Sequence, residues 1–181
     1  ELTIDSIQNG TCILFLGLEV FTNTKGERLE DRLLEYLKVK DDPQVRYYDD
    51  GLFFFKDPTR HTSTAYNIRK FFEQEELAEA KAIFDQLAQI PFHFIISTTP
   101  DHLLEEAFIK RNFKYRTTFY RKKQVQQRNL AVPTPQQPLL YNMLGSTTDT
   151  ESLVLDHNDL FDYIESVFEG NKMSNNLRDH I

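Results

Sequence analysis

The stretch FHFIISTTPDHLLEEAF, residues 92–108, decides the fold. Residues 92–96 form a run of apolar, β-favouring residues that is too short for a helix and stops at a polar cluster, which predicts a buried strand. Pro100 then fixes one backbone angle at the first turn of the next element, and apolar residues recur at helical spacing over 103–108. A helix is therefore predicted to begin near Asp101.

The polar cluster between this strand and this helix consists of Ser97, Thr98 and Thr99. Open α/β sheets bind ligands where a strand ends and feeds a helix N-terminus, because strand ends and unsatisfied amides converge there. We therefore expect a functional site of this chain to lie at Ser97–Thr99.

Two other stretches repeat the pattern of an apolar run that ends in glycine. The run TCILFLG at 11–17 predicts a central strand buried on both faces, and a leucine-rich helix is predicted to follow it over 28–39. That order of strand, glycine turn and helix is typical of the first unit of a dinucleotide-binding domain. The run LLYNMLG at 139–145 predicts a third central strand, ending at Gly145 and Ser146.

The remaining segments complete an alternation of strands and helices. Helices are predicted at residues 2–9, across 63–89 with a join at EQEE, and from an Asp156 N-cap to a Gly170 stop. A strand is predicted within 114–123, an extended segment at 152–155, and loops at 40–51 and 124–138. The run at 52–56 is too short to decide between helix and strand. The predicted fold is one three-layer α/β domain over residues 1–181 with a mostly parallel central sheet.

Composition narrows the classes of partner. The net charge of −7 and the pI near 5.2 oppose binding to nucleic acid or to an anionic membrane. No stretch has the roughly 20 apolar residues that span a bilayer, and no signal peptide opens the chain, so we expect a cytoplasmic protein. The single Cys12, in an apolar run, is interpreted as a small buried hydrophobe. The absence of Met at position 1 and the helix-like last residues predict a piece of a longer protein.

One basic cluster runs against the acidic composition. We interpret it as a solvated face, with a phosphate or RNA contact as the alternative. Its members are Lys110, Arg111, Lys114, Arg116, Arg121, Lys122, Lys123 and Arg128.

The candidate catalytic residues are few. No spacing of His, Cys and acidic residues predicts a metal site, and neither a nucleophile elbow nor a phosphate loop is present in the sequence. His93 lies on an apolar strand and is interpreted as a core residue. Glu105 and Glu106 are adjacent on a predicted helix, so their carboxylates point in different directions and cannot act as a pair.

Three stretches together resemble a known family. ILFLGLEV, ISTTPDHLLEEAF and NMLGSTTDTESLVLDHNDLFDYI are similar, in order and separation, to the sirtuin-like domains of bacterial defence and conflict proteins, over about residues 7–181. The third stretch is the most specific, because the family commonly shows a Leu-His-Gly-Ser turn, an acidic dipeptide and a Ser-Leu-Val-Leu-Thr segment before an aspartate-aromatic helix. The family usually continues into a strand reading Phe-Leu-Phe-Leu-Gly, so the resemblance implies a C-terminally truncated domain.

The resemblance implies a Rossmann-like fold that binds NAD, and in many members cleavage of the bond between nicotinamide and ribose. Three family features are changed in this chain. Gly-Ala-Gly is replaced by Gly17, Leu18 and Glu19, whose carboxylate would repel a pyrophosphate by about 1 to 4 kcal/mol at about 4 Å. Thr99 stands where the family has an asparagine that orients ribose and water. Leu144 stands where the family has a histidine that engages the ribose. Loss of a positioned acid or base typically costs about 10²- to 10⁴-fold in rate.

With these changes, the resemblance predicts a degenerate, non-catalytic domain that serves as an interaction, sensing or oligomerising module, with protein partners or self-association. Asp101, Gly17 and Gly145 survive from the family pattern, and Leu18 and Leu144 are expected to pack the old cleft shut. No cofactor and no metal is expected; NAD or ADP-ribose would bind if the pocket were open. The vestigial pocket is predicted at Gly17, Leu18, Glu19, Thr98, Thr99, Asp101, Gly145 and Ser146.

Two alternatives stay open at this point. One is a divergent NAD-cleaving effector, an NAD glycohydrolase, in which Asp101, Asn142 or Asp149 takes over the chemistry. The other is a change of ligand at Glu19 toward a less anionic nucleoside.

Overall fold

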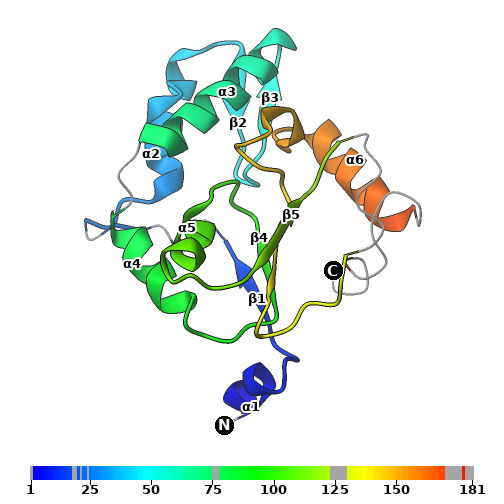
Figure 1. Cartoon of the computed structure of the whole chain (residues 1–181). Coiled ribbons are helices and arrows are strands. Elements are labelled where there is room, and N and C mark those ends of the chain that lie inside the picture. Colours follow the sequence, from blue (N-terminus) through cyan, green and yellow to red (C-terminus); the bar gives the residue numbers. More distant parts are fainter. Residues whose placement is uncertain are drawn as a thin grey trace. The chain divides into compact units, whose positions relative to one another are not determined.

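The structure is a computed structural model that describes residues 2–17, 20, 22–23, 25–74, 78–122, 130–169 and 177. Figure 1 shows the helices and strands. The chain divides into two compact units. The first, which we call the sheet unit, comprises Glu1–Asp31, Glu75–Phe119 and Pro133–Leu144, and the second, the hairpin unit, comprises Arg32–Gln74, Tyr120–Val132 and Gly145–Ile181.

The sheet unit is built on a four-stranded sheet of order β1-β4-β6-β5 in which all neighbouring strands are parallel. Its strands are β1 (Ile13–Leu16), β4 (Phe94–Ser97), β6 (Leu139–Asn142) and β5 (Arg116–Phe119). In this register Leu16 lies opposite Ser97, and Ser97 lies opposite Asn142. The carboxyl ends of the three predicted strands therefore meet at one edge of the sheet, as expected from the sequence.

Strands β4 and β6 are buried at every position, as their unbroken apolar runs predicted. Strand β1 is different, because in the described part of the chain it pairs with β4 alone and forms the edge of the sheet. Phe15 is 59% exposed and Ile13 is 37% exposed. The prediction that β1 is a central strand buried on both faces is wrong. An apolar run records that a strand is hydrophobic, but the number of its neighbours depends on tertiary structure.

Three helices accompany the sheet, namely α1 (Leu2–Gln8), α4 (Ala78–Leu87) and α5 (Leu103–Lys110). Helices α4 and α5 pack together, and ion pairs join Asp85 to Lys110 and Lys81 to Glu106. Helix α5 begins two residues after the predicted start at Asp101. The Asp101 carboxylate instead accepts a hydrogen bond from the Leu103 amide at 2.9 Å, so it stabilises the first turn from outside the helix.

The hairpin unit contains a two-stranded antiparallel sheet, β2 (Val45–Tyr47) and β3 (Phe53–Phe55), with α3 (Thr59–Gln74) and α6 (His157–Phe168). The short helix α2 (Leu29–Tyr36) runs from the sheet unit into this unit, and two 3₁₀ turns lie at Val39–Asp41 and Thr150–Ser152. The prediction of a loop over 40–51 is wrong for β2. The turn residues that suggested a loop lie on both sides of β2, at 41–43 before it and at 49–51 between the two strands. Gly51 there adopts a φ of 85°.

A hydrophobic cluster holds the hairpin unit together. Its buried members are Val45, Phe53, Ala65, Ile68, Leu153 and Leu155. The backbone amide of Phe53 donates to the carbonyl of Leu155 at 2.7 Å, which fastens the predicted extended segment 152–155 to β3. The N-cap prediction at Asp156 is confirmed, because its side chain accepts from the Asp159 amide in a reciprocal capping box. The predicted helix stop at Gly170 lies outside the described residues. Of the predicted join EQEE at 73–76, the first two residues belong to α3 and the other two lie outside the described residues.

None of the described helices has the length and apolar character needed to cross a membrane.

Truncation of Phe53 should destabilise the hairpin unit, since its ring is 3% exposed and sits in the cluster. We expect Phe53→Ala to lower the free energy of unfolding by about 3–5 kcal/mol, measured by urea denaturation. The neighbouring Phe54 is 47% exposed on the same strand. Phe54→Ala should change stability by less than about 0.5 kcal/mol, and an equal loss in both variants would contradict the assignment of this core.

Candidate functional site

The carboxyl edge of the sheet brings together part of the predicted pocket. Beyond the end of β1, a Cβ atom built on Gly17 would lie 3.9 Å from the Thr98 hydroxyl. Thr98 donates twice to the carbonyl of Leu16, from its amide at 2.9 Å and from its hydroxyl at 3.2 Å. The turn after β4 is therefore fastened to β1 by Thr98, next to Gly17. Leu18 and Glu19 lie outside the described residues.

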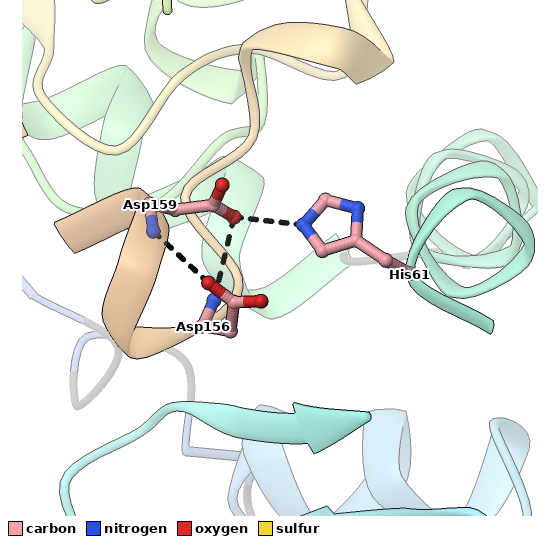
Figure 2. A group of neighbouring side chains, drawn as sticks. All are labelled: His61, Asp156 and Asp159. Carbon is pink, nitrogen blue, oxygen red and sulfur yellow. Dashed lines mark hydrogen bonds and ion pairs between the residues drawn. The ribbon is translucent and has the colours of Figure 1, made fainter. Parts of the chain in front are cut away.

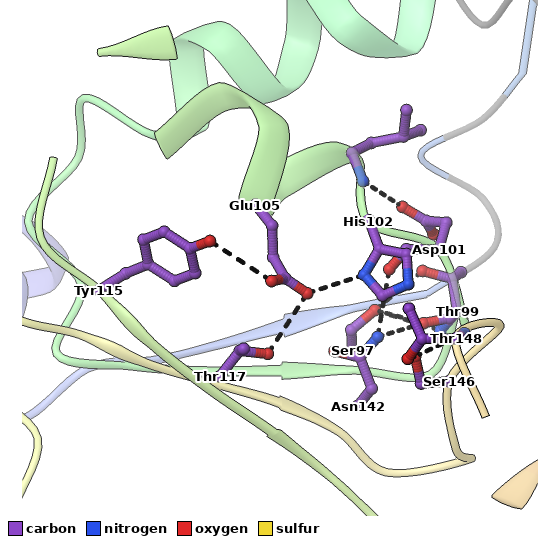
Figure 3. A network of polar contacts seen from close by, with 11 residues as sticks. Ser97, Thr99, Asp101, His102, Glu105, Tyr115, Thr117, Asn142, Ser146 and Thr148 are labelled. Carbon is purple, nitrogen blue, oxygen red and sulfur yellow. Dashed lines mark hydrogen bonds and ion pairs between the residues drawn. The ribbon is translucent and has the colours of Figure 1, made fainter. Parts of the chain in front are cut away.

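Thr99 faces inward at this edge and is 2% exposed. Its hydroxyl lies 2.8 Å from the hydroxyl of Ser97, and its amide donates to Ser97 Oγ at 3.1 Å (Figure 3). The hydroxyl groups that the sequence offered as ligand contacts thus bond to one another and to the turn. Their hydrogen bonds shape the backbone between β4 and α5.

Asn142, at the end of β6, locks the same turn from the neighbouring strand. Its Nδ2 group donates to the carbonyl of Thr99 at 3.3 Å and to the carbonyl of Asp101 at 3.2 Å (Figure 3). The side chain is buried, and both amide hydrogens are used. Sequence reasoning named Asn142 only as a substitute catalyst. A polar residue inside an otherwise apolar run was the available signal that it has a buried partner.

Asp101 carries an ionisable carboxyl group in the turn between β4 and α5, and the residue is 8% exposed. Burial raises the pKa of its carboxyl, although the Thr99 side chain and the Leu103 amide oppose the shift. Its second oxygen, Oδ2, has no hydrogen-bond partner among the described residues, and the same holds for Oδ1 of Asn142. A protonated Asp101 can donate a hydrogen bond. Asp101 Oδ2 in its ionised form and Asn142 Oδ1 can each accept a hydrogen bond from a donor that enters the site.

His102 and Glu105 form an ion pair beside this turn. His102 Nδ1 lies 2.8 Å from Glu105 Oε1, and this hydrogen bond raises the pKa of the imidazole. Thr117 donates to the same carboxylate at 3.3 Å and Tyr115 donates to it at 3.5 Å. Glu106 instead pairs with a lysine of α4, so the two adjacent glutamates serve different partners, as expected.

Gly145 and Ser146 belong to the hairpin unit, where they form a tight turn before α6. Gly145 has a φ of 91°, and a Cβ atom there would lie 2.3 Å from the carbonyl oxygen of Ser152. The amide of Ser146 donates to the Ser152 hydroxyl at 2.9 Å, and the Ser146 side chain is 1% exposed. These contacts indicate that Gly145 and Ser146 stabilise this turn. Leu144, where the resemblance implies a histidine, is half-buried.

A second cluster of ionisable groups lies in the hairpin unit, and the sequence did not reveal it. His61 of α3 and Asp159 of α6 are 98 residues apart, yet His61 Nε2 lies 2.7 Å from Asp159 Oδ2 (Figure 2). Lys122 contacts the other oxygen of Asp159 at 2.6 Å. Burial raises the pKa of Asp159, but the bonds from His61 and Lys122 outweigh it and hold the pKa at about 2.

His61, Asp156 and Asp159 are close enough to hold a metal ion, since one ligand atom from each lies within 4.8 Å of the others. The donors are already engaged, however. Asp159 binds a lysine, a histidine and the Leu155 amide, and the Asp156 carboxylate accepts the helix hydrogen bond from the Asp159 amide. An ammonium group on the central carboxylate competes directly with a cation. This arrangement fits an ion-paired helix cap better than a metal centre.

The turn at Gly145 predicts a large effect of a single methyl group. Gly145→Ala should lower the free energy of unfolding by more than the approximately 1–3 kcal/mol of positive-φ strain, because the added Cβ also collides with backbone. Gly26 is a matched control, with a φ of 78° and no atom within 4 Å of an added Cβ. If thermal or urea denaturation finds equal losses of stability in Gly26→Ala and Gly145→Ala, the backbone of Ser152 does not lie as close to Gly145 as described.

The Asp159 cluster predicts a dependence of stability on pH. Because the folded-state pKa of about 2 lies below the ordinary value of 3.8, ionised Asp159 stabilises the fold above about pH 4, and this contribution disappears as the pH falls through 2. The stability difference between wild type and Asp159→Asn should therefore shrink by about 2 kcal/mol from pH 6 to pH 2. Asp50→Asn, which removes the half-exposed pair with His157, should show little such change.

The comparisons with known proteins agree with the resemblance in the sequence. No curated protein matches the chain. A family model described as a SIR2-like domain matches residues 93–181, the segment that holds β4, α5, β5, β6 and α6. The parallel sheet with its flanking helices is the Rossmann-like α/β architecture that the resemblance implied. Residues 93–181 are therefore similar to a SIR2-like domain, and the match supports a sirtuin-like fold for this part of the chain.

Proposed function

We propose that this SIR2-like domain has kept its architecture without NAD hydrolysis and acts as an interaction module of a defence-type protein, through protein partners or self-association. The observation that carries the proposal is the network of Ser97, Thr99 and Asn142. These polar side chains at the carboxyl edge are buried and bond to one another or to backbone carbonyls. Groups that would orient a substrate in a catalytic domain stabilise the turn in this one.

The changed family positions support the same conclusion. The Thr99 hydroxyl is occupied by Ser97, so it is poorly placed to orient ribose or water. Leu144 offers no proton at the histidine position. Asp101 survives, but its Oδ1 atom is used at the start of α5. The proposal therefore gives the residues that remain from the family pattern a structural role.

The second candidate function is a divergent NAD-cleaving domain. It is favoured by the two buried oxygens without a described partner, Asp101 Oδ2 and Asn142 Oδ1, because buried polar atoms are normally hydrogen-bonded. Under this alternative a ligand donor satisfies them, and Asp101 acts in its protonated form. NAD or ADP-ribose would then be the cofactor-like ligand of the sheet edge.

Nicotinamide release from NAD tests the proposal. We expect the wild-type chain to release nicotinamide at the buffer rate, because no acid or base stands at position 144 and no amide at position 99. The Thr99→Asn/Leu144→His double variant measures what the family residues restore, and Thr62→Asn on an exposed turn of α3 controls for the added amide. Wild-type release above the buffer rate would overturn the non-catalytic proposal, and wild-type release as fast as that of an active double variant would favour the second candidate.

A further inference from the structure

A set of hydrogen bonds within the sheet unit links the first turn of α5 to β5 (Figure 3). His102 directly precedes α5, and its Nδ1 atom lies 2.8 Å from Glu105 Oε1. The same carboxylate accepts a hydrogen bond from the Thr117 hydroxyl at 3.3 Å and one from the Tyr115 hydroxyl at 3.5 Å. Glu105 therefore connects a histidine at the start of α5 to two hydroxyl donors at β5. We call these four residues the Glu105 bridge.

The imidazole of His102 is the member of the bridge that changes charge near neutral pH. Its hydrogen bond to Glu105 raises the pKa of the ring from the ordinary value of 6.5, although burial opposes the shift. The charges that favour the imidazolium also include those of Asp101 and Glu106. Tyr115 stays a donor at neutral pH, because burial and the charge of Glu105 raise its pKa from the ordinary value of 10.0.

The exposure of the two partners suits a response to the pH of the solvent. The side chain of His102 is 31% exposed, so its ring exchanges protons with water, whereas the side chain of Glu105 is 15% exposed. Water therefore screens this pair less than it screens a pair on the open surface. A hydrogen bond between an imidazolium and a carboxylate is stronger than one from a neutral imidazole, so protonation of His102 strengthens the bridge.

The backbone around His102 carries this change to the start of α5. The carbonyl of His102 accepts a hydrogen bond from the Glu106 amide at 2.9 Å, which forms the first turn of the helix. The adjacent Asp101 accepts from the Leu103 amide at 2.9 Å. Whatever holds the ring of His102 in place therefore also holds these two backbone contacts, and with them the carboxyl of Asp101 at the edge of the sheet.

We propose that the Glu105 bridge is a pH-sensitive switch, in which the proton on His102 holds the start of α5 and Asp101 in place, and loss of this proton lets the turn open more often. The switch regulates the order of the sheet edge whether or not that edge acts on NAD.

The direction of the effect follows from the raised pKa of His102. Protonated His102 contributes its full stabilisation below about pH 6.5, and this contribution disappears as the pH rises through the pKa of the folded state. Amide hydrogen exchange at Leu103 and Glu106 measures the opening of the turn. After correction for the intrinsic pH dependence of exchange, we expect about threefold higher protection at about pH 6 than at about pH 8, because the hydrogen bond is charge-assisted only at the lower pH.

Two variants separate the switch from a general effect of pH. His102→Gln keeps a hydrogen-bond donor near Glu105 but does not titrate, so the protection of the two amides should be the same at both pH values. His157→Gln is the matched control, because His157 also pairs with a carboxylate, that of Asp50 at 3.0 Å, but lies in the hairpin unit. This variant should keep the threefold difference.

An NMR titration of the His102 ring completes the test. We expect a midpoint above 6.5 in wild type and a lower midpoint in Glu105→Gln. A wild-type midpoint at or below 6.5, or one that Glu105→Gln leaves unchanged, would overturn the switch. A difference in protection that persists in His102→Gln would also overturn it and would assign the pH dependence to the carboxyl of Asp101. These measurements use no NAD, so their outcome is independent of the nicotinamide assay.

Discussion

The amide of Asn142 is the contact on which the turn between β4 and α5 depends. From the end of β6 it reaches two carbonyls, those of Thr99 and Asp101, that follow the neighbouring strand. A buried carbonyl without a partner is unfavourable by about 1–3 kcal/mol, and Asn142 removes this penalty at Asp101 while it shares the Thr99 carbonyl with the Ser97 hydroxyl. The position of Asp101, and with it the start of α5, follows from that contact.

The hairpin unit uses the same type of contact before α6. Ser152 accepts from the amide of Ser146, and Asp156 accepts from the amide of Asp159. In each case a short polar side chain replaces a missing backbone partner, so the chain can turn tightly and then start a helix. In both units, polar residues in the segments that carry the family resemblance therefore hydrogen-bond to backbone groups and stabilise turns. This is the physical basis for proposing a module that binds partners instead of converting NAD.

The sequence by itself determined the elements whose signals are local. The apolar runs predicted β4 and β6, helical spacing predicted α5 and α6, and the Asp156 cap was evident because a capping box spans only a few residues. Tertiary structure alone decided the hydrogen bonds from Asn142 to the turn after β4, the pairing of His61 with Asp159 across 98 residues, and the position of β1 beside β4 alone in the described sheet. Each of these depends on which distant segments become neighbours, and neither composition nor periodicity carries that information.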